Sequence, residues 1–220
     1  MTRPSPEGRE VEIVTPDYTL YGNLAVPEDA EALVLFAHGS GSSRFSTRNR
    51  FVARHLREGG LGTLLFDLLT AEEEQVDRFT RHLRFDIPML AERLVAATDW
   101  VRQQPQIADS TIGYFGSSTG AAAALIAASR RPEVVDAVVS RGGRPDLAMP
   151  VLHEVTQPTL LIVGGRDVPV IGMNEEALEA MTIDEAELTI VPGATHLFEE
   201  PGALEQVADL AREWFVHYLT

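Results

Sequence analysis

Short apolar runs alternate along this chain with longer segments in which apolar residues recur every three or four positions. Runs that are apolar throughout, such as 33–37 and 160–163, are typical of strands buried on both faces of a parallel sheet. The longer segments, such as the one that Asp86 caps and that extends to about Gln103, predict helices with one buried face. The alternation therefore predicts an α/β fold, with a mostly parallel sheet covered by helices on both faces.

The pattern places the boundaries of these elements approximately. Strands are predicted at 10–14, 20–26, 33–37, 63–66, 111–115, 134–140, 159–163 and 188–191, so the sheet has about eight strands, and the first two form a hairpin. Helices are predicted at 49–58, 86–103, 119–129, 174–180 and 203–218. Residues 67–84 are the least regular and predict a short helical excursion beside the site. No insertion is long enough for a large lid, and no linker is visible, so we expect a single domain over residues 1–220.

A tight turn between a strand and a helix carries the most specific local signal. The apolar strand 111–115 leads into Gly-Ser-Ser-Thr-Gly at 116–120, and an alanine-rich helix follows. A Gly-x-Ser-x-Gly turn in this setting projects its central serine, Ser118, from the end of the sheet. Gly116 and Gly120 leave space where the strand and the helix approach closely. Ser118 is therefore the predicted nucleophile of an acyl transfer.

Two other strand ends carry the partners that a serine nucleophile needs. A serine hydroxyl is a weak nucleophile, and His196, in the turn after the last predicted strand, is the candidate base. Asp167, in a glycine-rich turn after an apolar strand, is the candidate that orients the imidazole. Asp146 is the alternative, because it also lies between Ser118 and His196 along the chain. The chain order serine, aspartate, histidine is the one expected for this kind of hydrolase.

The oxyanion of the tetrahedral intermediate needs preset hydrogen-bond donors as well. The backbone N–H of Thr119, at the start of the helix, is one candidate. The backbone N–H of Ser40, in the loop His38-Gly39-Ser40-Gly41, is the second. We expect His38 to shape this loop rather than to take part in the chemistry.

Composition excludes several other classes of function. The net charge of -15 argues against a nucleic-acid partner, and no segment approaches the roughly 20 apolar residues of a membrane span. The chain has no cysteine and no cluster with metal-ligand spacing, so we expect no disulfide, no metal and no cofactor. The N-terminus lacks an apolar signal core, which makes a cytoplasmic location the default expectation. We expect a monomer or a small homo-oligomer.

These residues together resemble the α/β-hydrolase fold and, within it, the dienelactone hydrolase-like family, over nearly the whole chain. The motifs that carry the resemblance are His38-Gly39-Ser40-Gly41, Gly116-Ser117-Ser118-Thr119-Gly120, Asp167 and Gly193-Ala194-Thr195-His196-Leu197-Phe198. The resemblance implies hydrolysis of carboxylic esters through an acyl-enzyme. Authentic dienelactone hydrolases use cysteine as the nucleophile, and this chain has none. That departure favours a serine esterase and argues against assuming dienelactone as the substrate.

A narrower resemblance concerns three strings, at 38–44, 81–86 and 140–146. They are similar to those of a bacterial subgroup of hydrolases that is sometimes joined to phosphoribosyltransferase-like domains. No such domain is expected within these 220 residues.

Arginines gather near the predicted strand ends although the chain as a whole is acidic. Arg44 follows the His38 loop, Arg84 closes the irregular stretch, and Arg141 follows strand 134–140. One hypothesis is that such arginines bind an anionic group of the substrate, a carboxylate or a phosphate, through bidentate hydrogen bonds. The alternative is that they form salt bridges with nearby acids such as Asp86, Asp146 or Glu72 to Glu74.

The leading hypothesis is a serine hydrolase that acts on small, soluble carboxylic esters, and the arginine hypothesis extends it to anionic ones. Thioesters and lactones are chemically adjacent substrates, and peptides are less favoured because no substrate-gating domain is visible. A protein of another class, a catalytically silent binding protein with the hydrolase fold, is the alternative, although the intact Ser118, Asp167 and His196 argue against it. A dinucleotide-binding fold is set aside, because Gly113-x-x-Gly116 lacks the Gly-x-Gly-x-x-Gly arrangement.

Overall fold

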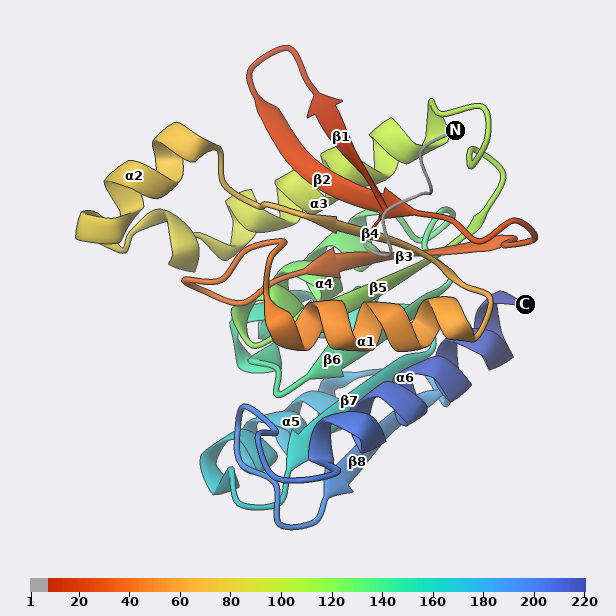
Figure 1. Cartoon of the computed structure of the whole chain (residues 1–220). Coiled ribbons are helices and arrows are strands. Elements are labelled where there is room, and N and C mark those ends of the chain that lie inside the picture. Colours follow the sequence, from red (N-terminus) through yellow and green to blue (C-terminus); the bar gives the residue numbers. More distant parts are fainter. Residues whose placement is uncertain (1–7) are drawn as a thin grey trace.

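The computed structural model describes residues 8–220, which form one eight-stranded sheet with helices on both faces (Figure 1). In spatial order the strands are β1-β2-β4-β3-β5-β6-β7-β8. Their bounds are Arg9–Val14 (β1), Thr19–Ala25 (β2), Ala32–Ala37 (β3), Gly62–Phe66 (β4), Thr111–Ser117 (β5), Ala137–Arg141 (β6), Thr159–Gly164 (β7) and Ala186–Val191 (β8). The pairs β1–β2 and β2–β4 are antiparallel and all other pairs are parallel. The predicted α/β class and the mostly parallel sheet are confirmed.

Two groups of helices cover the two faces of this sheet. The α-helices are α1 (Thr47–Glu58), α2 (Ala71–Thr80), α3 (Ile87–Arg102), α4 (Thr119–Arg130), α5 (Val168–Ala180) and α6 (Ala203–Leu219). The 3₁₀ segments are η1 (Leu83–Phe85) and η2 (Pro145–Glu154). Helices α1 and α6 pack together on one face, whereas α3, α4 and α5 lie on the other (Figure 1). Within residues 8–220, no helix is long and apolar enough to cross a membrane.

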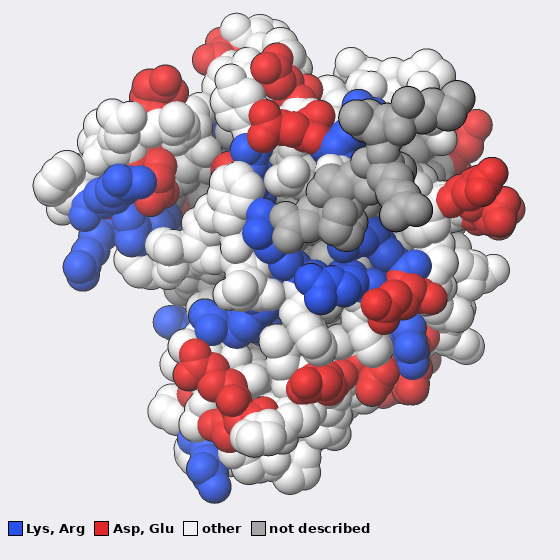
Figure 2. Space-filling model, in the orientation of Figure 1, with Lys and Arg blue, Asp and Glu red and all other residues white. Residues whose placement is uncertain are grey.

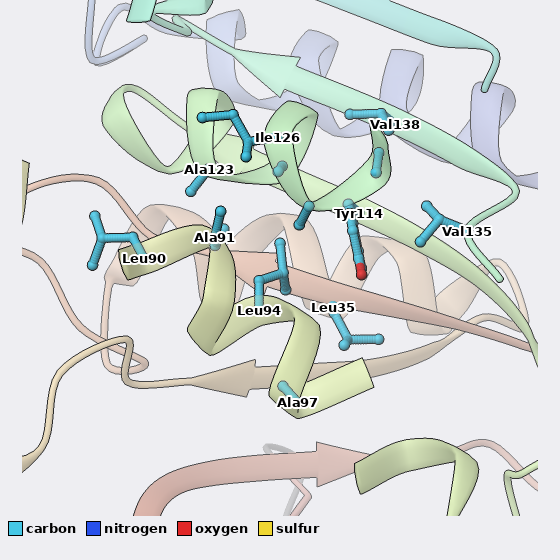
Figure 3. Close-up of a cluster of buried hydrophobic side chains, with 14 of the residues drawn as sticks. Leu35, Leu90, Ala91, Leu94, Ala97, Tyr114, Ala123, Ile126, Val135 and Val138 are labelled. Atoms are coloured by element: carbon cyan, nitrogen blue, oxygen red, sulfur yellow. The ribbon is translucent and has the colours of Figure 1, made fainter. Parts of the chain in front are cut away.

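The apolar core lies between the sheet and these helix layers. Every residue of β3 and β7 is buried, as the continuous apolar runs predict. On one face, side chains of α3 meet the alanine-rich helix α4 over the sheet residues Leu35, Tyr114 and Val138 (Figure 3). Small side chains such as Ala123 allow α4 to pack close to its neighbours. The one polar group of Tyr114, its hydroxyl, is satisfied by Thr98 at 2.6 Å.

The helix and strand bounds differ from the predictions in a few places, each with a local cause. Helix α5 begins at Val168, six residues before the predicted 174, because Asp167 is its N-cap and Pro169 fits the first turn. Strand β6 begins at Ala137 rather than 134, because the N–H groups of Val134 and Val135 bond back to the carbonyl of Arg131. Within 67–84 the predicted helical excursion is α2, and the sequence analysis did not predict η2.

The order of the strands fixes where a site can form. Strand β3 connects through α1 to β4 on one side, and β5 connects through α4 to β6 on the other. Strands β3 and β5 are neighbours, so the chain leaves their carboxyl ends in opposite directions and opens a crevice between them. The His38 loop and Ser118 lie at these two strand ends.

Candidate active site

Ser118 lies at the sharp junction between β5 and α4. Its backbone has φ 52° and ψ -120°, a conformation that side chains other than glycine rarely adopt. A Cβ atom at Gly116 would lie 2.4 Å from Cα of Ala121, and one at Gly120 would lie 2.2 Å from the carbonyl oxygen of Ala37. Both positions therefore require glycine, as predicted. The turn holds the Ser118 side chain at the edge of the sheet, the geometry expected of a nucleophile elbow.

The structure brings His196 and Asp167 together and leaves Asp146 apart. Nδ1 of His196 lies 2.6 Å from Oδ2 of Asp167. Although Asp167 is the N-cap of α5, its carboxylate caps no backbone N–H and is free to bind the imidazole. Asp146 instead accepts two hydrogen bonds from the guanidinium of Arg144, both at 2.8 Å. Of the two candidate aspartates, only Asp167 can orient His196.

Ser118 and His196 line one cavity of about 250 Å³. Arg141, at the end of β6, contacts Ser118, and the next residue, Gly142, lies beside His196. The N–H of Ser118 donates to the carbonyl of Arg141 at 3.2 Å, and a Cβ atom on Gly142 would lie 3.5 Å from the imidazole of His196. Glu200 fixes the turn that carries His196 by accepting the N–H of Thr195 at 3.0 Å. The end of β6 thus lies beside both Ser118 and His196, at the same cavity.

The two predicted oxyanion donors differ in the structure. Thr119 is the first residue of α4, so its N–H has no acceptor within the helix. The His38 loop passes beside the nucleophile, because a Cβ atom on Gly39 would lie 3.2 Å from Cβ of Ser118. The N–H of Ser40, however, donates to Oγ1 of Thr119 at 2.9 Å. The second predicted donor is therefore already bonded, since the buried hydroxyl of Thr119 needs a partner.

His38 shapes its loop, as the sequence analysis predicts. Its Nδ1–H donates to the carbonyl of Gly39 at 3.0 Å, and its Nε2 accepts the N–H of Leu68 at 3.1 Å. Burial lowers the pKa of His38 below its ordinary value, although the bond to Gly39 and the charge of Asp67 partly oppose this shift. A neutral imidazole therefore ties the His38 loop to the segment after β4.

Two of the three arginines predicted to bind substrate are held by carboxylates away from Ser118. Arg44 forms ion pairs with Glu10 at 2.8 Å and with Asp67 at 3.5 Å. Nε of Arg84 lies 2.5 Å from Oδ2 of the buried Asp77. Neither arginine lines the cavity at Ser118. Both arginines therefore form salt bridges, with partners other than the acids expected, and a role for them in binding substrate stays a prediction.

Arg141 does line the cavity at Ser118. It is 7% exposed, and its Nε and Nη1 are buried without a hydrogen-bond partner among the residues that the structure describes. Burial, together with the nearby charge of Arg48, lowers the pKa of Arg141 to about 10. At neutral pH the guanidinium therefore keeps its positive charge inside the cavity.

Two further polar residues of this cavity, Ser117 and Asn49, have no role predicted from the sequence. Oγ of Ser117 donates to Oδ1 of the buried Asn49 at 3.0 Å, which ties β5 to the first turn of α1, and Arg48 lies on the cavity wall beside them. Ser117 is part of the Gly-x-Ser-x-Gly turn and could have been noticed there, whereas nothing in the sequence marks Asn49. No group of three or more His, Cys, Asp or Glu side chains within residues 8–220 could hold a metal ion.

Comparison with known proteins identifies the family and agrees with the fold. The model of the dienelactone hydrolase family matches residues 22–217. A crystal structure of a dienelactone hydrolase from Anabaena variabilis is 59% identical and superimposes with a TM-score of 0.94, over 97% of this chain and 100% of that one. An esterase from Pyrococcus furiosus shares the fold at 18% identity, with a TM-score of 0.77 over 96% of this chain and 91% of that one.

A curated relative from Mycobacterium tuberculosis strain H37Rv carries the name "putative phosphoribosyl transferase". It is 54% identical over 216 residues, which cover 98% of this chain and 48% of the relative. The chain therefore spans about half the length of such curated relatives.

Proposed function

This chain belongs to the dienelactone hydrolase family, and we propose that it is a serine hydrolase that cleaves small carboxylic esters through an acyl-enzyme. The observation that carries the proposal is the 2.6 Å contact between His196 and Asp167 on the same cavity as the strained Ser118. A nucleophile on a tight turn, a histidine and a carboxylate that orients the histidine are the three groups that this chemistry needs.

The proposed reaction begins with attack of Oγ of Ser118 on the ester carbonyl. The proton of the hydroxyl passes to Nε2 of His196, because Nδ1 is occupied by the bond to Asp167. Nε2 then gives this proton to the departing alkoxide, which leaves as the alcohol. A water molecule attacks the acyl-enzyme, again losing a proton to His196, and the proton returns to Ser118 as the acid leaves.

The oxyanion is stabilised first by the N–H of Thr119. The N–H of Ser40 can contribute only by sharing, or by leaving, its bond to Oγ1 of Thr119. Substrates are expected to be short, because a cavity of about 250 Å³ lies below the usual range of roughly 300–1,000 Å³ for drug-sized ligands. The transferase activity named for the curated relatives is not part of this proposal, because this chain matches about half of their length.

The test combines a fluorophosphonate probe with a panel of p-nitrophenyl esters, thioesters and lactones. We expect the folded protein to be labelled and to hydrolyse short esters, and the Ser118→Ala variant to lose labelling and about 10³-fold or more of kcat. The control is Ser43→Ala, which removes a hydroxyl that lies in a neighbouring cavity and accepts the N–H of Phe45. Folded wild-type protein that stays unlabelled would support a silent binding protein, and labelling that persists in Ser118→Ala would place the nucleophile elsewhere.

A further inference from the structure

Arg141 is a buried charge for which the protein supplies no counter-ion. Ala137 and Val139 of β6 pack into the core on the face of α1 and α6, so Arg141, two residues further along the strand, faces the same layer. No carboxylate within residues 8–220 pairs with its guanidinium, and two of its nitrogens are buried without a partner. Buried charges are normally paired, because an unpaired one destabilises the folded state. An unpaired guanidinium on the wall of an active-site cavity therefore indicates that a ligand supplies the missing anion.

The neighbours of Arg141 in the cavity add positive charge. The side chain of Arg48 lies close enough to lower the pKa of Arg141 and lines the same cavity. Its contact with Glu199, at 3.2 Å, joins two partly or fully exposed side chains and leaves Glu199 on the protein surface. The first turn of α1 also borders the cavity and contains no acidic residue. Ser46 accepts the N–H of Asn49 at 3.3 Å, and the positive end of the helix dipole favours an anion beside this turn as well.

The charge distribution on the outer face is consistent with this arrangement. Figure 2 shows a band of basic side chains across the middle of the face that carries α1, with acidic side chains above and below the band. Helix α1 contributes Arg48, Arg50, Arg54 and Arg57 to the chain's 18 basic residues. An anionic substrate would therefore meet a favourable local potential on this face, although the net charge of the chain is -15.

We propose that Arg141, Arg48 and the first turn of α1 bind an oxyanionic group, a carboxylate or a phosphate, carried by the substrate itself. The proposal rests on the function proposed above and names the substrate class of that site. Ser118 and Arg141 line the same small cavity, so the anionic group and the reacting carbonyl are separated by only a short spacer. The guanidinium fork matches two oxygens of such a group, which fixes the orientation of the ester as well as its affinity.

Three p-nitrophenyl esters of nearly equal length test this proposal. The butyrate is neutral, the succinate monoester ends in a carboxylate, and the 3-phosphonopropionate ends in a phosphonate. We expect the wild-type protein to prefer one of the two charged esters. Arg141→Met should lower kcat/KM for that ester about 10- to 100-fold more than it lowers kcat/KM for the butyrate, which has no anionic group. The preferred charged ester identifies the chemistry of the group.

Arg144→Met is the matched control, because Arg144 lies three residues away and already has a carboxylate partner, Asp146. We expect this variant to keep the wild-type preference, and Arg141→Lys to restore part of it through charge alone. A loss in Arg141→Met that is equal for charged and neutral esters would overturn the proposal, and so would a wild-type preference for the butyrate. Should Arg141→Met fail to fold, Arg48→Met and Arg141→Lys provide the same comparison of charged with neutral ester.

A binding measurement separates this proposal from the proposed function. Inorganic phosphate and acetate are titrated into the Ser118→Ala variant, in which no hydrolysis is expected, and into the double variant Ser118→Ala, Arg141→Met. Binding of either anion that disappears in the double variant supports the anion site, even if the wild-type protein were to hydrolyse none of the esters. Binding that is equal in both proteins, or absent from both, contradicts it.

Discussion

Two cavities lie side by side at the carboxyl edge of the sheet. Each contains an arginine, which has a carboxylate partner in one cavity and none in the other. The larger, of about 720 Å³, lies between the loop after β3 and α2, and its Arg44 faces the carboxylate of Asp67. The smaller, of about 250 Å³, contains Ser118 and His196, and its Arg141 faces no carboxylate within residues 8–220. Both cavities are lined by Ser42 and Ser46, so they share a wall.

The contrast distinguishes arginines whose charge stabilises the fold through ion pairs from an arginine whose charge is available to a ligand. Arg44 and Arg84 each connect segments that are distant in sequence or irregular, and their acid partners balance them. Arg141 makes no such connection through its side chain in the residues described, and it is almost fully buried. An unbalanced buried charge lowers stability, and sites that trade stability for function are typically binding or catalytic sites. The small cavity is therefore the one in which chemistry and recognition are expected.

The largest effect is expected from a comparison of two carboxylates, Asp167, which contacts His196 of the smaller cavity, and Asp67, which lines the larger one. Asp167→Asn keeps the shape of the side chain but removes the charge that holds the tautomer of His196, so we expect kcat to fall by about 10⁴-fold. Asp67→Asn removes a charge in the larger cavity and should change kcat by less than about threefold. Steady-state hydrolysis of p-nitrophenyl butyrate measures both. A larger loss in Asp146→Asn than in Asp167→Asn would instead assign the orienting role to Asp146.

The next effect concerns stability and tests the contrast between the arginines directly. Arg84→Met leaves the carboxylate of Asp77, which is fully buried, without its partner, so we expect the free energy of unfolding to fall by about 3 to 5 kcal/mol. Arg141→Met removes an unpaired buried charge and keeps most of the side-chain volume. We therefore expect its free energy of unfolding to be unchanged, or to rise by about 1 kcal/mol or more. Urea denaturation without added anions provides the measurement.

Adding anions to the buffer of the same denaturation experiment provides a control. Added phosphate or acetate should stabilise the wild-type protein relative to Arg141→Met, because a ligand that binds only the folded state raises stability. A fall of several kcal/mol in Arg141→Met without anions would show that this guanidinium has a structural partner, and the contrast between the two cavities would not hold.

The sequence predicts much of this site because its signals are local. The apolar run 111–115 and the two glycines around Ser118 together indicate the tight turn, because a Cβ atom at either glycine would clash with the backbone. Asp167 and His196 each follow a buried strand, and the carboxyl ends of parallel strands meet at one edge of the sheet. Strand order, by contrast, depends on which helices cross the sheet, so the neighbours of Arg141 could not be identified from spacing.

The pairing of charged side chains was harder to predict for a physical reason. Arg84 is seven residues from Asp77, and only the left-handed backbone of Arg81 at the end of α2 brings the two together. Arg44 reaches Glu10, which is 34 residues away. The N–H of Ser40 was predicted as an oxyanion donor, yet it is bonded to the side chain of Thr119, a detail that depends on one rotamer. Local motifs thus predicted which residues lie around Ser118, whereas long-range packing determined which arginine remained unpaired.

The smallest expected effect concerns His38, which lines the larger cavity and is neutral in the folded protein. Burial lowers its pKa below the ordinary value of 6.5, so at acidic pH the unfolded chain binds a proton there that the folded chain does not. Stability supplied by neutral His38 is complete above pH 6.5 and is lost as the pH falls toward the lowered pKa. In urea denaturation between pH 7.5 and pH 5.5, His38→Gln should therefore lose less stability than the wild-type protein. Equal losses of stability in the two proteins would mean that His38 has the same pKa in the folded and unfolded states. His38 would then accept a proton in the larger cavity without any unfolding of the loop that it holds.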